Sequence, residues 1–282
     1  MIGQVYKVHT DSYSVKVGEN ILICGARGVL KKRGNEILVG DYVYVENNTI
    51  TRIEKRNNRF IRPNVANVDM VVVLISPEPK PDFYLIDKLV VNAIKENSKI
   101  LFVINKTDMN ESLKELIKTE YGRLDVQTLQ VSAKNGDGID YLKDMLKGKL
   151  SVLAGQSAVG KTSIVNAMFN LDLKTGDVSG IGRGRHTTTR SEIFEAEEIR
   201  VIDSPGFAVI DAAVEAEDFP SYYPEYEMEA VNCKFRGCKH IGEPDCRVKE
   251  LVSSGVFSKE RYRRYVEIYN ELLKRRKIYE KN

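Results

Sequence analysis

The stretch at residues 150–163, LSVLAGQSAVGKTS, constrains the fold of this chain more than any other. An apolar run ends in Gly155, Gly160 and Lys161 follow, and the residues after Thr162 have a helical composition. A strand, G-x-x-x-x-G-K-T and a helix, in this order, form the context that a phosphate-binding loop requires. In such a loop the backbone N–H groups and the lysine hold phosphates, and the threonine hydroxyl reaches Mg²⁺. A chance match in a Gly-containing turn is the alternative, which the correct flanks disfavour.

The length of 282 residues predicts two or three domains. No apolar stretch reaches the roughly 18 residues of a membrane span. The first residues, MIGQVYKVHTD, lack the pattern of a secretory signal, so we expect a cytoplasmic protein. Three of the four cysteines lie between Cys233 and Cys246, which in a reducing compartment favours metal binding over disulfides.

Charge is unevenly distributed along the chain. The net charge is +5 over residues 1–64 and +5 over residues 261–282, whereas the whole chain carries only +3. Two basic ends around an acidic middle suggest a polyanionic partner that is held from both sides. Solvated surface charge is the simpler alternative for either end alone.

Residues 1–64 predict a small β-barrel. Five short segments rich in Val, Ile and Tyr follow one another with no helix between them, at residues 2–8, 13–17, 21–24, 37–45 and 49–54. An OB-type barrel fits this pattern, and such barrels commonly bind nucleic acid. The basic segment 26–34 is a candidate phosphate-contacting loop, although a purely structural barrel is nearly as well supported. Pro63 places the domain boundary near residue 64.

Residues 65–150 alternate between buried strands and helices, which predicts an α/β domain with a parallel sheet. The strand at 99–104 ends in the motif Asn105, Lys106, Thr107 and Asp108. Ligands bind at the carboxyl ends of such strands. A carboxylate there can accept hydrogen bonds from N1–H and the 2-amino group of guanine, a donor pair that adenine lacks. One strand later, backbone N–H groups can meet the guanine carbonyl at Ser132, Ala133 and Lys134. Each motif alone could be an ordinary turn.

Two further motifs follow the phosphate loop. The glycine-rich run TGDVSGIGRGRHTTTR predicts a mobile loop whose threonines reach Mg²⁺ when a γ-phosphate is present. A short strand then leads into Asp203-Ser204-Pro205-Gly206. The aspartate can hold the Mg²⁺ shell, and the Gly206 N–H can contact the γ-phosphate. Without a preceding phosphate loop, DSPG would be interpreted as a β-turn.

Three thiols and one imidazole lie within 14 positions, at Cys233, Cys238, His240 and Cys246. Four protein ligands of this kind fit tetrahedral Zn²⁺ and predict a closed structural site. Four unconnected residues are the alternative. From Lys249 onward the chain is predicted to be helical with one apolar face. Its basic residues, among them Arg261, Arg263 and Arg264, alternate with tyrosines and suit rRNA, and a solvated helix face is the usual alternative.

These motifs resemble the five signatures of a GTPase in permuted order, because the guanine-reading motifs precede the phosphate loop. With a barrel in front and a Cys/His cluster behind, nearly the whole chain resembles the RsgA family of bacterial GTPases that mature the small ribosomal subunit. The resemblance implies an OB-type β-barrel (1–64), a circularly permuted α/β P-loop GTPase domain (65–225) and a zinc-binding helical module (226–282). It implies hydrolysis of GTP to GDP and phosphate, stimulated by the small subunit, and binding to rRNA; we expect a monomer.

The resemblance also implies the site residues. Guanine nucleotide would be bound by Asn105, Lys106, Thr107, Asp108, Ser132, Ala133, Lys134, Gly155, Gln156, Ser157, Ala158, Val159, Gly160, Lys161, Thr162, Ser163, Asp203 and Gly206. Mg²⁺ would be held by Thr162, Asp203 and one of Thr187 to Thr189, for which we choose Thr189. One structural Zn²⁺ would be held by Cys233, Cys238, His240 and Cys246. The candidate catalytic residues are Lys161, His186 and Thr189.

Two positions modify this expectation. Phe207 stands where Ras-like enzymes have a water-orienting glutamine. His186 is the nearest candidate to orient the attacking water, although loop histidines are more often bystanders. Ala158 replaces the family's usual glycine and strains the loop if its φ is positive. We therefore expect slow intrinsic hydrolysis that a partner accelerates by ordering the loop.

Two other functions remain open. One is a GTP-dependent RNA-binding or translation factor with a different target. The other is a zinc-stabilised nucleic-acid-binding protein whose nucleotide site is vestigial. Intact Lys161, Thr162 and Asp203 argue against the second, since each has a role in phosphate or Mg²⁺ binding.

Overall fold

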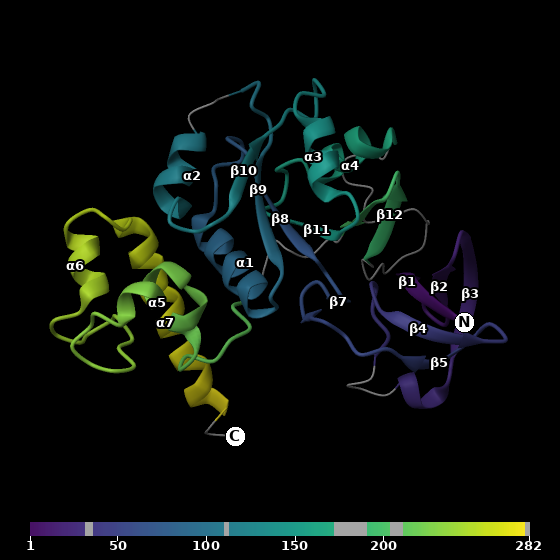
Figure 1. Ribbon diagram of the computed structural model, residues 1–282, viewed down its shortest axis with the longest axis horizontal. Coiled ribbons are helices and arrows are strands. Elements are labelled where there is room, and N and C mark those ends of the chain that lie inside the picture. The colour runs from purple at the N-terminus through teal and green to yellow at the C-terminus, as the bar shows by residue number, and fades with distance from the viewer. Residues whose placement is uncertain (32–35, 110–112, 172–190, 204–210, 280–282) are drawn as a thin grey trace.

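The computed structural model describes residues 1–31, 36–109, 113–171, 191–203 and 211–279. Three parts follow one another along the chain (Figure 1). The amino-terminal part is a closed barrel of β1 (Ile2–Val8), β2 (Tyr13–Val17), β3 (Asn20–Ala26), β4 (Tyr42–Glu46) and β5 (Thr49–Ile53). The strand order is β1-β2-β3-β5-β4, and β1 pairs with β4 to close the barrel. The predicted five-stranded barrel is confirmed.

One predicted strand, residues 37–45, is shorter than expected. Strand β4 begins only at Tyr42, because the chain turns at Gly40, whose φ is +93°. A Cβ at Gly40 would lie 2.0 Å from the carbonyl oxygen of Ala66, so only glycine fits here. A 3₁₀ helix at Gly28–Lys31 lies between β3 and β4, within the basic segment.

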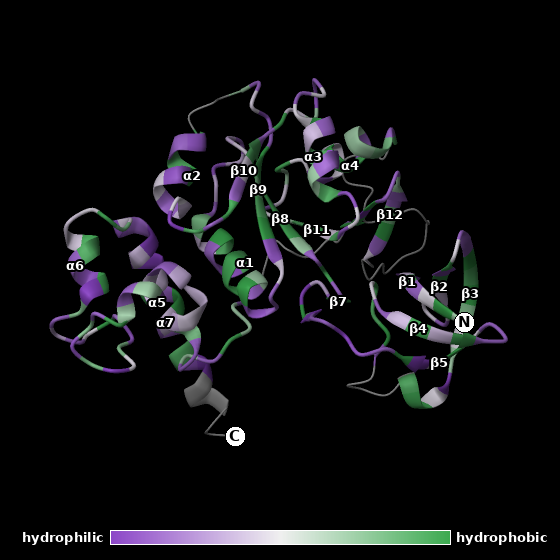
Figure 2. Cartoon of the chain, viewed as in Figure 1, coloured by the Kyte–Doolittle hydropathy of each residue, from purple (hydrophilic) through white to green (hydrophobic). Residues whose placement is uncertain are grey.

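The central part is an α/β sheet with helices on both faces. Its parallel strands are β8 (Met70–Ile75), β9 (Lys99–Ile104), β10 (Gln127–Gln130), β11 (Leu150–Ala154) and β13 (Ile199–Asp203), and β12 (Glu192–Ala196) is antiparallel to β13. Helices α1 (Phe83–Lys95) and α2 (Leu113–Tyr121) cover one face, and α3 (Ile139–Leu146) and α4 (Lys161–Phe169) cover the other. Because both faces are covered, strands β8 and β11 are buried along their whole length. Figure 2 colours the chain by hydropathy and shows hydrophobic residues in these central strands.

The sheet order is β10-β9-β8-β11-β13-β12. Strand β11, which leads into the phosphate loop, therefore lies between one strand that precedes it in the sequence and one that follows it. Strand β8 precedes it by about 80 residues in the sequence, and β13 follows it. The carboxyl ends of all five parallel strands therefore meet at one edge, where the nucleotide motifs were predicted.

β-Structure joins the barrel to the α/β part. Strand β12 pairs with β1, with Lys7 opposite Glu192, so that the two parts form one continuous sheet of 11 strands. Side chains reinforce this pairing. Lys7 Nζ lies 2.6 Å from a Glu192 carboxylate oxygen, and the Tyr6 hydroxyl donates a hydrogen bond to Glu195 (2.5 Å).

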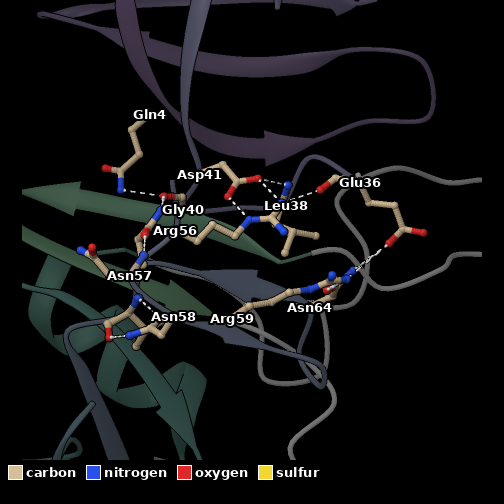
Figure 3. A network of polar contacts seen from close by, with 12 residues as sticks. Gln4, Glu36, Leu38, Gly40, Asp41, Arg56, Asn57, Asn58, Arg59 and Asn64 are labelled. Atoms are coloured by element: carbon tan, nitrogen blue, oxygen red, sulfur yellow. Dashed lines mark hydrogen bonds and ion pairs between the residues drawn. The ribbon is translucent and has the colours of Figure 1, made fainter. Parts of the chain in front are cut away.

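The linker between the two parts is held by a network of polar contacts (Figure 3). Arg56 Nε lies 2.6 Å from Oδ1 of the buried Asp41. The Asn58 side chain accepts a hydrogen bond from the Val68 N–H at Oδ1 (2.9 Å) and donates one from Nδ2 to the Val68 carbonyl (2.8 Å). Between Asn58 and Val68 in the sequence, strands β6 (Arg59–Phe60) and β7 (Val65–Ala66) form an antiparallel pair. The predicted boundary near residue 64 falls within this structured linker, and the bounds of the three domains stay predictions.

The carboxyl-terminal part consists of a 3₁₀ helix (Phe219–Tyr222), α5 (Pro224–Ala230), α6 (Arg247–Ser253) and α7 (Lys259–Tyr279). The continuous helix expected from Lys249 is split in two at Gly255, whose φ is +79°. An aromatic core holds this part together and packs against α1. Among the described residues, no helix combines the length and the apolar character needed to cross a bilayer.

Two of the three arginines proposed above for rRNA are buried. Arg261 and Arg264 are only 3% and 6% exposed. Both form ion pairs with Asp87 of α1, Arg261 also pairs with Glu225, and Arg264 also pairs with Glu120. The interpretation of Arg261 and Arg264 as RNA ligands is therefore wrong. Their charges instead fix α7 to the α/β part.

Candidate nucleotide site and metal cluster

The phosphate-binding loop lies between β11 and α4, as predicted. Gly155 follows β11 directly, and a Cβ at this position would lie 2.4 Å from the Leu74 carbonyl oxygen. Gly160 is the N-cap residue of α4 and has a φ of +97°. A Cβ there would lie 2.3 Å from the side-chain nitrogen of Asn105. Both glycines are therefore required by close packing, which brings the loop against neighbouring strands and the start of α4 against the guanine motif.

The loop lysine spans its own loop. Lys161 Nζ donates hydrogen bonds to the carbonyl oxygens of Gly155 (2.9 Å) and Gln156 (2.7 Å). Burial lowers the pKa of Lys161, and the charge of Asp203 acts in the opposite direction. The amine thus lies against the backbone of the loop, within electrostatic reach of Asp203 at the end of β13.

Ala158 adopts the strained conformation that the sequence left open. Its φ is +63°, in the left-handed region where a Cβ clashes with the following carbonyl oxygen. Its side chain is exposed, so packing does not require the methyl group. The loop therefore carries a side chain that disfavours the backbone conformation adopted at this position.

We expect Ala158→Gly to raise the free energy of unfolding by about 1 kcal/mol, because glycine tolerates this φ without a clash. Urea titration followed by circular dichroism measures the change. Ala167→Gly is the matched control, since Ala167 lies inside α4 with helical geometry. That control should lower stability by about 1 kcal/mol. Equal destabilisation by both substitutions would contradict the assigned strain.

Asn105 connects three motifs that are far apart in the sequence. Its Nδ2 donates to the Val159 carbonyl in the phosphate loop (3.0 Å), and its Oδ1 accepts from the Ala133 N–H (3.1 Å). The side chain is only 2% exposed. The motif at residues 105–108 (NKTD), the motif at residues 132–134 (SAK) and the phosphate loop therefore meet in space, although Asn105 and Val159 are 54 positions apart.

Asp108 lies at the rim of this assembly. Its carboxylate is exposed, and its Oδ1 accepts a hydrogen bond from the Ser132 hydroxyl (2.9 Å). The Ser132 oxygen in turn accepts a hydrogen bond from the Asn135 N–H (3.3 Å). One oxygen of Asp108 is thus held by the SAK motif while the group stays accessible to a ligand. Thr107 anchors the same turn through its hydroxyl, which donates to the Val131 carbonyl (3.0 Å).

Sequence analysis missed a further wall of the site, residues 76–82. Lys106 Nζ donates to the carbonyl oxygens of both Ala158 (2.9 Å) and Glu78 (2.6 Å). Gln156 of the phosphate loop accepts a hydrogen bond from the Asp82 N–H (3.1 Å). A signal for this wall was available, because the segment directly follows β8 at the ligand-binding edge of the sheet.

Asp203 ends β13, directly beside β11 in the sheet. Its side chain is only 4% exposed, and its charge reaches Lys161. Both observations agree with a carboxylate that faces the phosphate loop. Gly206, Phe207, His186 and Thr187–Thr189 lie outside the described residues, so their roles stay predictions.

The predicted metal ligands form one cluster. The ligand atoms of Cys233, Cys238, His240 and Cys246 all lie within 4.8 Å of one another. His240 Nδ1 is 3.3 Å from the Cys246 sulfur and 3.7 Å from the Cys233 sulfur. Ligand atoms around a tetrahedral Zn²⁺ are about 3.3–3.8 Å apart, as Zn–ligand bonds of about 2.0–2.3 Å require.

The chemistry of this cluster also calls for a cation. None of its three cysteines forms a disulfide. Burial raises the pKa of Cys238 and of Cys246, so thiolates at these positions need a neighbouring positive charge. The cluster lies on loops held by α7, since the Tyr262 hydroxyl donates to the His240 carbonyl (2.6 Å) and the Tyr265 hydroxyl to the Lys239 carbonyl (2.8 Å). The donor set therefore fits Zn²⁺.

Two family models match the chain in succession. The model described as "RsgA N-terminal domain" matches residues 2–52, and the model described as "RsgA GTPase" matches residues 53–213. The chain belongs to the RsgA GTPase family. RsgA family membership makes it a GTP hydrolase that uses guanine nucleotide and Mg²⁺.

Curated RsgA relatives match along nearly the whole chain. A Thermotoga petrophila protein named "Small ribosomal subunit biogenesis GTPase RsgA" is 38% identical, over 98% of this chain and 98% of its own length. A protein of the same name from Clostridium botulinum is 34% identical, over 97% of this chain and 98% of its own length.

Two solved structures of high similarity share this fold. YjeQ from Thermotoga maritima superimposes with a TM-score of 0.80 at 33% sequence identity, covering 96% of this chain and 98% of that one. YloQ, described as a circularly permuted GTPase, superimposes with a TM-score of 0.78 at 28% identity, covering 97% of this chain and 95% of that one. The permuted order of motifs in this RsgA chain is thereby confirmed.

Proposed function

We propose that this RsgA protein binds the small ribosomal subunit in its GTP form late in subunit maturation and leaves after hydrolysis. The observation that carries the proposal is the position of Asn105, which joins the guanine-reading motifs to the phosphate loop. Binding of one guanine nucleotide across these motifs gives the protein two states. Hydrolysis then acts as a timer for release.

The residues of the site take the following roles. Asp108 accepts hydrogen bonds from guanine N1–H and the 2-amino group, and Ser132 holds its carboxylate for this task. Lys161 and the backbone of the phosphate loop hold the β- and γ-phosphates. Thr162, Asp203 and Thr189 are the proposed Mg²⁺ ligands, and His186 is proposed to orient the attacking water.

The names of the relatives associate them with biogenesis of the small ribosomal subunit. The barrel offers chemistry that suits rRNA, because the guanidinium of Arg52 on β5 stacks 3.9 Å above the ring of Tyr44 on β4. Paired aromatic and cationic groups favour base stacking and phosphate contact. We propose that the protein acts as a monomer in the cytoplasm, where the subunit is assembled.

Turnover of GTP with and without purified small subunits tests the proposal. We expect clear stimulation of wild type, which the ordering of a loop by a partner would produce, and its loss in His186→Ala. The absence of stimulation would favour a GTP-dependent RNA-binding factor with another target. Full stimulated activity of His186→Ala would remove only the water-orienting role.

Asp108→Asn is expected to shift base preference from guanine to xanthine. The amide presents an N–H donor where the carboxylate presents an acceptor, so it opposes the 2-amino group of guanine and matches the 2-oxo group of xanthine. Competition of GTP, XTP and ATP for a fluorescent nucleotide measures the change. A variant that still binds GTP best would contradict the base-reading role, and Asp137→Asn is the control for an exposed acidic residue nearby.

We propose that Cys233, Cys238, His240 and Cys246 bind one structural Zn²⁺. Cys238→Ser is expected to reduce the zinc content from about one ion per chain to near zero, since three remaining ligands leave a structural site open. Elemental analysis after dialysis measures this. Cys24→Ser is the matched control, because Cys24 is buried in the barrel away from the cluster. Unchanged zinc content in Cys238→Ser would refute the assignment.

A further inference from the structure

The segment that follows β8 emerges between the two strands that carry the nucleotide motifs. Strand β8 pairs with β9, which leads into the NKTD motif, and with β11, which leads into the phosphate loop (Figure 1). The carbonyl of Ile75, the last residue of β8, accepts a hydrogen bond from the Asn105 N–H (2.8 Å). Residues 76–82 therefore begin at the centre of the edge where ligands bind in a parallel sheet.

Ser76 is the first residue of this segment, and its side chain is fully buried. Its exposed fraction is 0%. The Ser76 hydroxyl donates a hydrogen bond to the carbonyl oxygen of Glu78 (2.6 Å). Because the hydroxyl is shielded from water, this hydrogen bond holds the turn of residues 76–78 with little competition from solvent.

The same carbonyl holds the lysine of the NKTD motif. Lys106 Nζ donates to the Glu78 carbonyl oxygen (2.6 Å) and to that of Ala158 in the phosphate loop (2.9 Å). A carbonyl oxygen has two lone pairs, so Ser76 and Lys106 can both donate to Glu78. The φ of Lys106 is +60°, a strained conformation that persists only where surrounding contacts hold the residue. The position of the Glu78 carbonyl thus sets the position of the Lys106 ammonium group.

The far end of the segment is fixed independently of Ser76. Asp82 is the N-cap residue of α1, and its Oδ1 accepts a hydrogen bond from the Leu85 N–H (3.0 Å). Its own N–H donates to the Gln156 side chain (3.1 Å). With both ends held in β8 and α1, removal of the Ser76 hydroxyl loosens the turn at Glu78 without detaching the whole segment.

We propose that Ser76 is a positioning residue for guanine-nucleotide binding, which acts by holding the Glu78 carbonyl against the Lys106 ammonium group. The inference rests on the proposed role of Lys106 in binding guanine. Ser76 is buried, so it acts on the nucleotide only through Lys106. Because Lys106 serves the base, GDP and GTP are affected equally. Lys161, the proposed phosphate ligand, bonds to the carbonyl oxygens of its own loop, so hydrolysis of bound GTP is spared.

Nucleotide affinity and single-turnover hydrolysis at saturating GTP, both measured per folded molecule of full-length protein, test this. We expect Ser76→Ala to raise the Kd for GDP and for a non-hydrolysable GTP analogue about fivefold, the usual effect of losing one hydrogen bond. The hydrolysis rate should stay within twofold of wild type. Ser76→Cys, whose thiol is a weaker donor, should give a smaller increase in Kd and serves if Ser76→Ala folds poorly.

Ser98→Ala is the matched control, because Ser98 is likewise buried and its hydroxyl donates to a backbone carbonyl, that of Val68 (2.8 Å). It should lose stability but keep the wild-type Kd for GDP. A merely structural role of Ser76 would give the same result as this control.

A double-mutant cycle shows whether Ser76 acts through Lys106. Lys106→Met keeps an apolar side chain without the ammonium group and should raise the Kd for GDP about tenfold, since hydrogen bonds from charged groups are the stronger ones. In this background Ser76→Ala should add less than a twofold increase, because the group that it positions is gone.

The outcomes separate the inference from its premise. A Kd within twofold of wild type in both Ser76 variants, or a fivefold increase that persists in the Lys106→Met background, would overturn the inference alone. Wild-type GDP affinity in Lys106→Met would refute the proposed role of Lys106 and the inference with it. Failure of the ribosomal proposal is separate, since it would appear as unstimulated turnover of wild type.

Discussion

Lys161→Ala is expected to lower the rate of GTP hydrolysis at saturating nucleotide about 10²- to 10³-fold, the usual effect of removing one group that stabilises developing charge. Lys161 Nζ lies across the phosphate loop, on the carbonyl oxygens of Gly155 and Gln156. The proposed role of this amine is to neutralise negative charge on the transferred phosphoryl group, so its removal is expected to slow the hydrolytic step as well as weaken binding. Single-turnover assays with excess protein separate the two effects.

The matched control for this prediction is Lys99→Ala. Lys99 is exposed and begins β9, at the amino edge of the sheet, whereas the nucleotide motifs lie at the carboxyl edge. The control should hydrolyse GTP at the wild-type rate. If Lys161→Ala retained more than a tenth of the wild-type rate with bound nucleotide, the loop would not be the phosphate site.

Asp87→Ala is expected to lower the free energy of unfolding by about 3–5 kcal/mol, which is the usual cost of breaking a buried ion pair by removing one partner. The Asp87 carboxylate is 1% exposed. It pairs with Arg264 (2.5 Å) and Arg261 (3.4 Å) and accepts a hydrogen bond from the Tyr121 hydroxyl (2.8 Å). Removal leaves two buried guanidinium groups with Glu120 and Glu225 as their remaining anionic partners.

Urea or guanidinium titration measures this loss. A loss of this size is a large fraction of the stability of an ordinary domain, so partial detachment of α7 from α1 is the expected consequence. Asp140→Ala is the control, because the Asp140 side chain is 97% exposed and, within the part of the chain that the structure describes, its ion pair is with Lys143 on the same helix (3.5 Å). It should change stability by less than about 1 kcal/mol. A similar loss of unfolding free energy in both variants would show that burial does not increase the contribution of the Asp87 ion pairs to stability.

The parts of the site that sequence analysis predicted are those encoded by short spacing. A phosphate loop needs its glycines, lysine and threonine within a few positions, and a zinc cluster needs closely spaced Cys and His. Helical and strand periodicity then placed these motifs at one edge of a parallel sheet. The structure agrees, because Asn105 contacts both Val159 and the Ala133 N–H.

The parts that it missed depend on pairs of residues far apart in the chain. Arg261 and Arg264 have the appearance of surface residues until Asp87, 174 and 177 positions away, is known to face them. Ser76 gives no signal at all, since a serine that follows a buried strand is ordinary and Lys106, which donates to the same Glu78 carbonyl, lies 28 positions beyond Glu78. The resemblance to RsgA supplied the order of domains but not these contacts.

The sheet that runs unbroken from β10 through β12 into β1 sets a distance. Neighbouring strands are about 4.8 Å apart, so the three steps from β11 to β1 place the first strand of the barrel about 14 Å from the strand that leads into the phosphate loop. Backbone hydrogen bonds resist stretching far more than a flexible tether does. The distance between the barrel and the phosphate loop is therefore fixed by the sheet. A partner that binds the barrel is held at a constant distance from the phosphate loop.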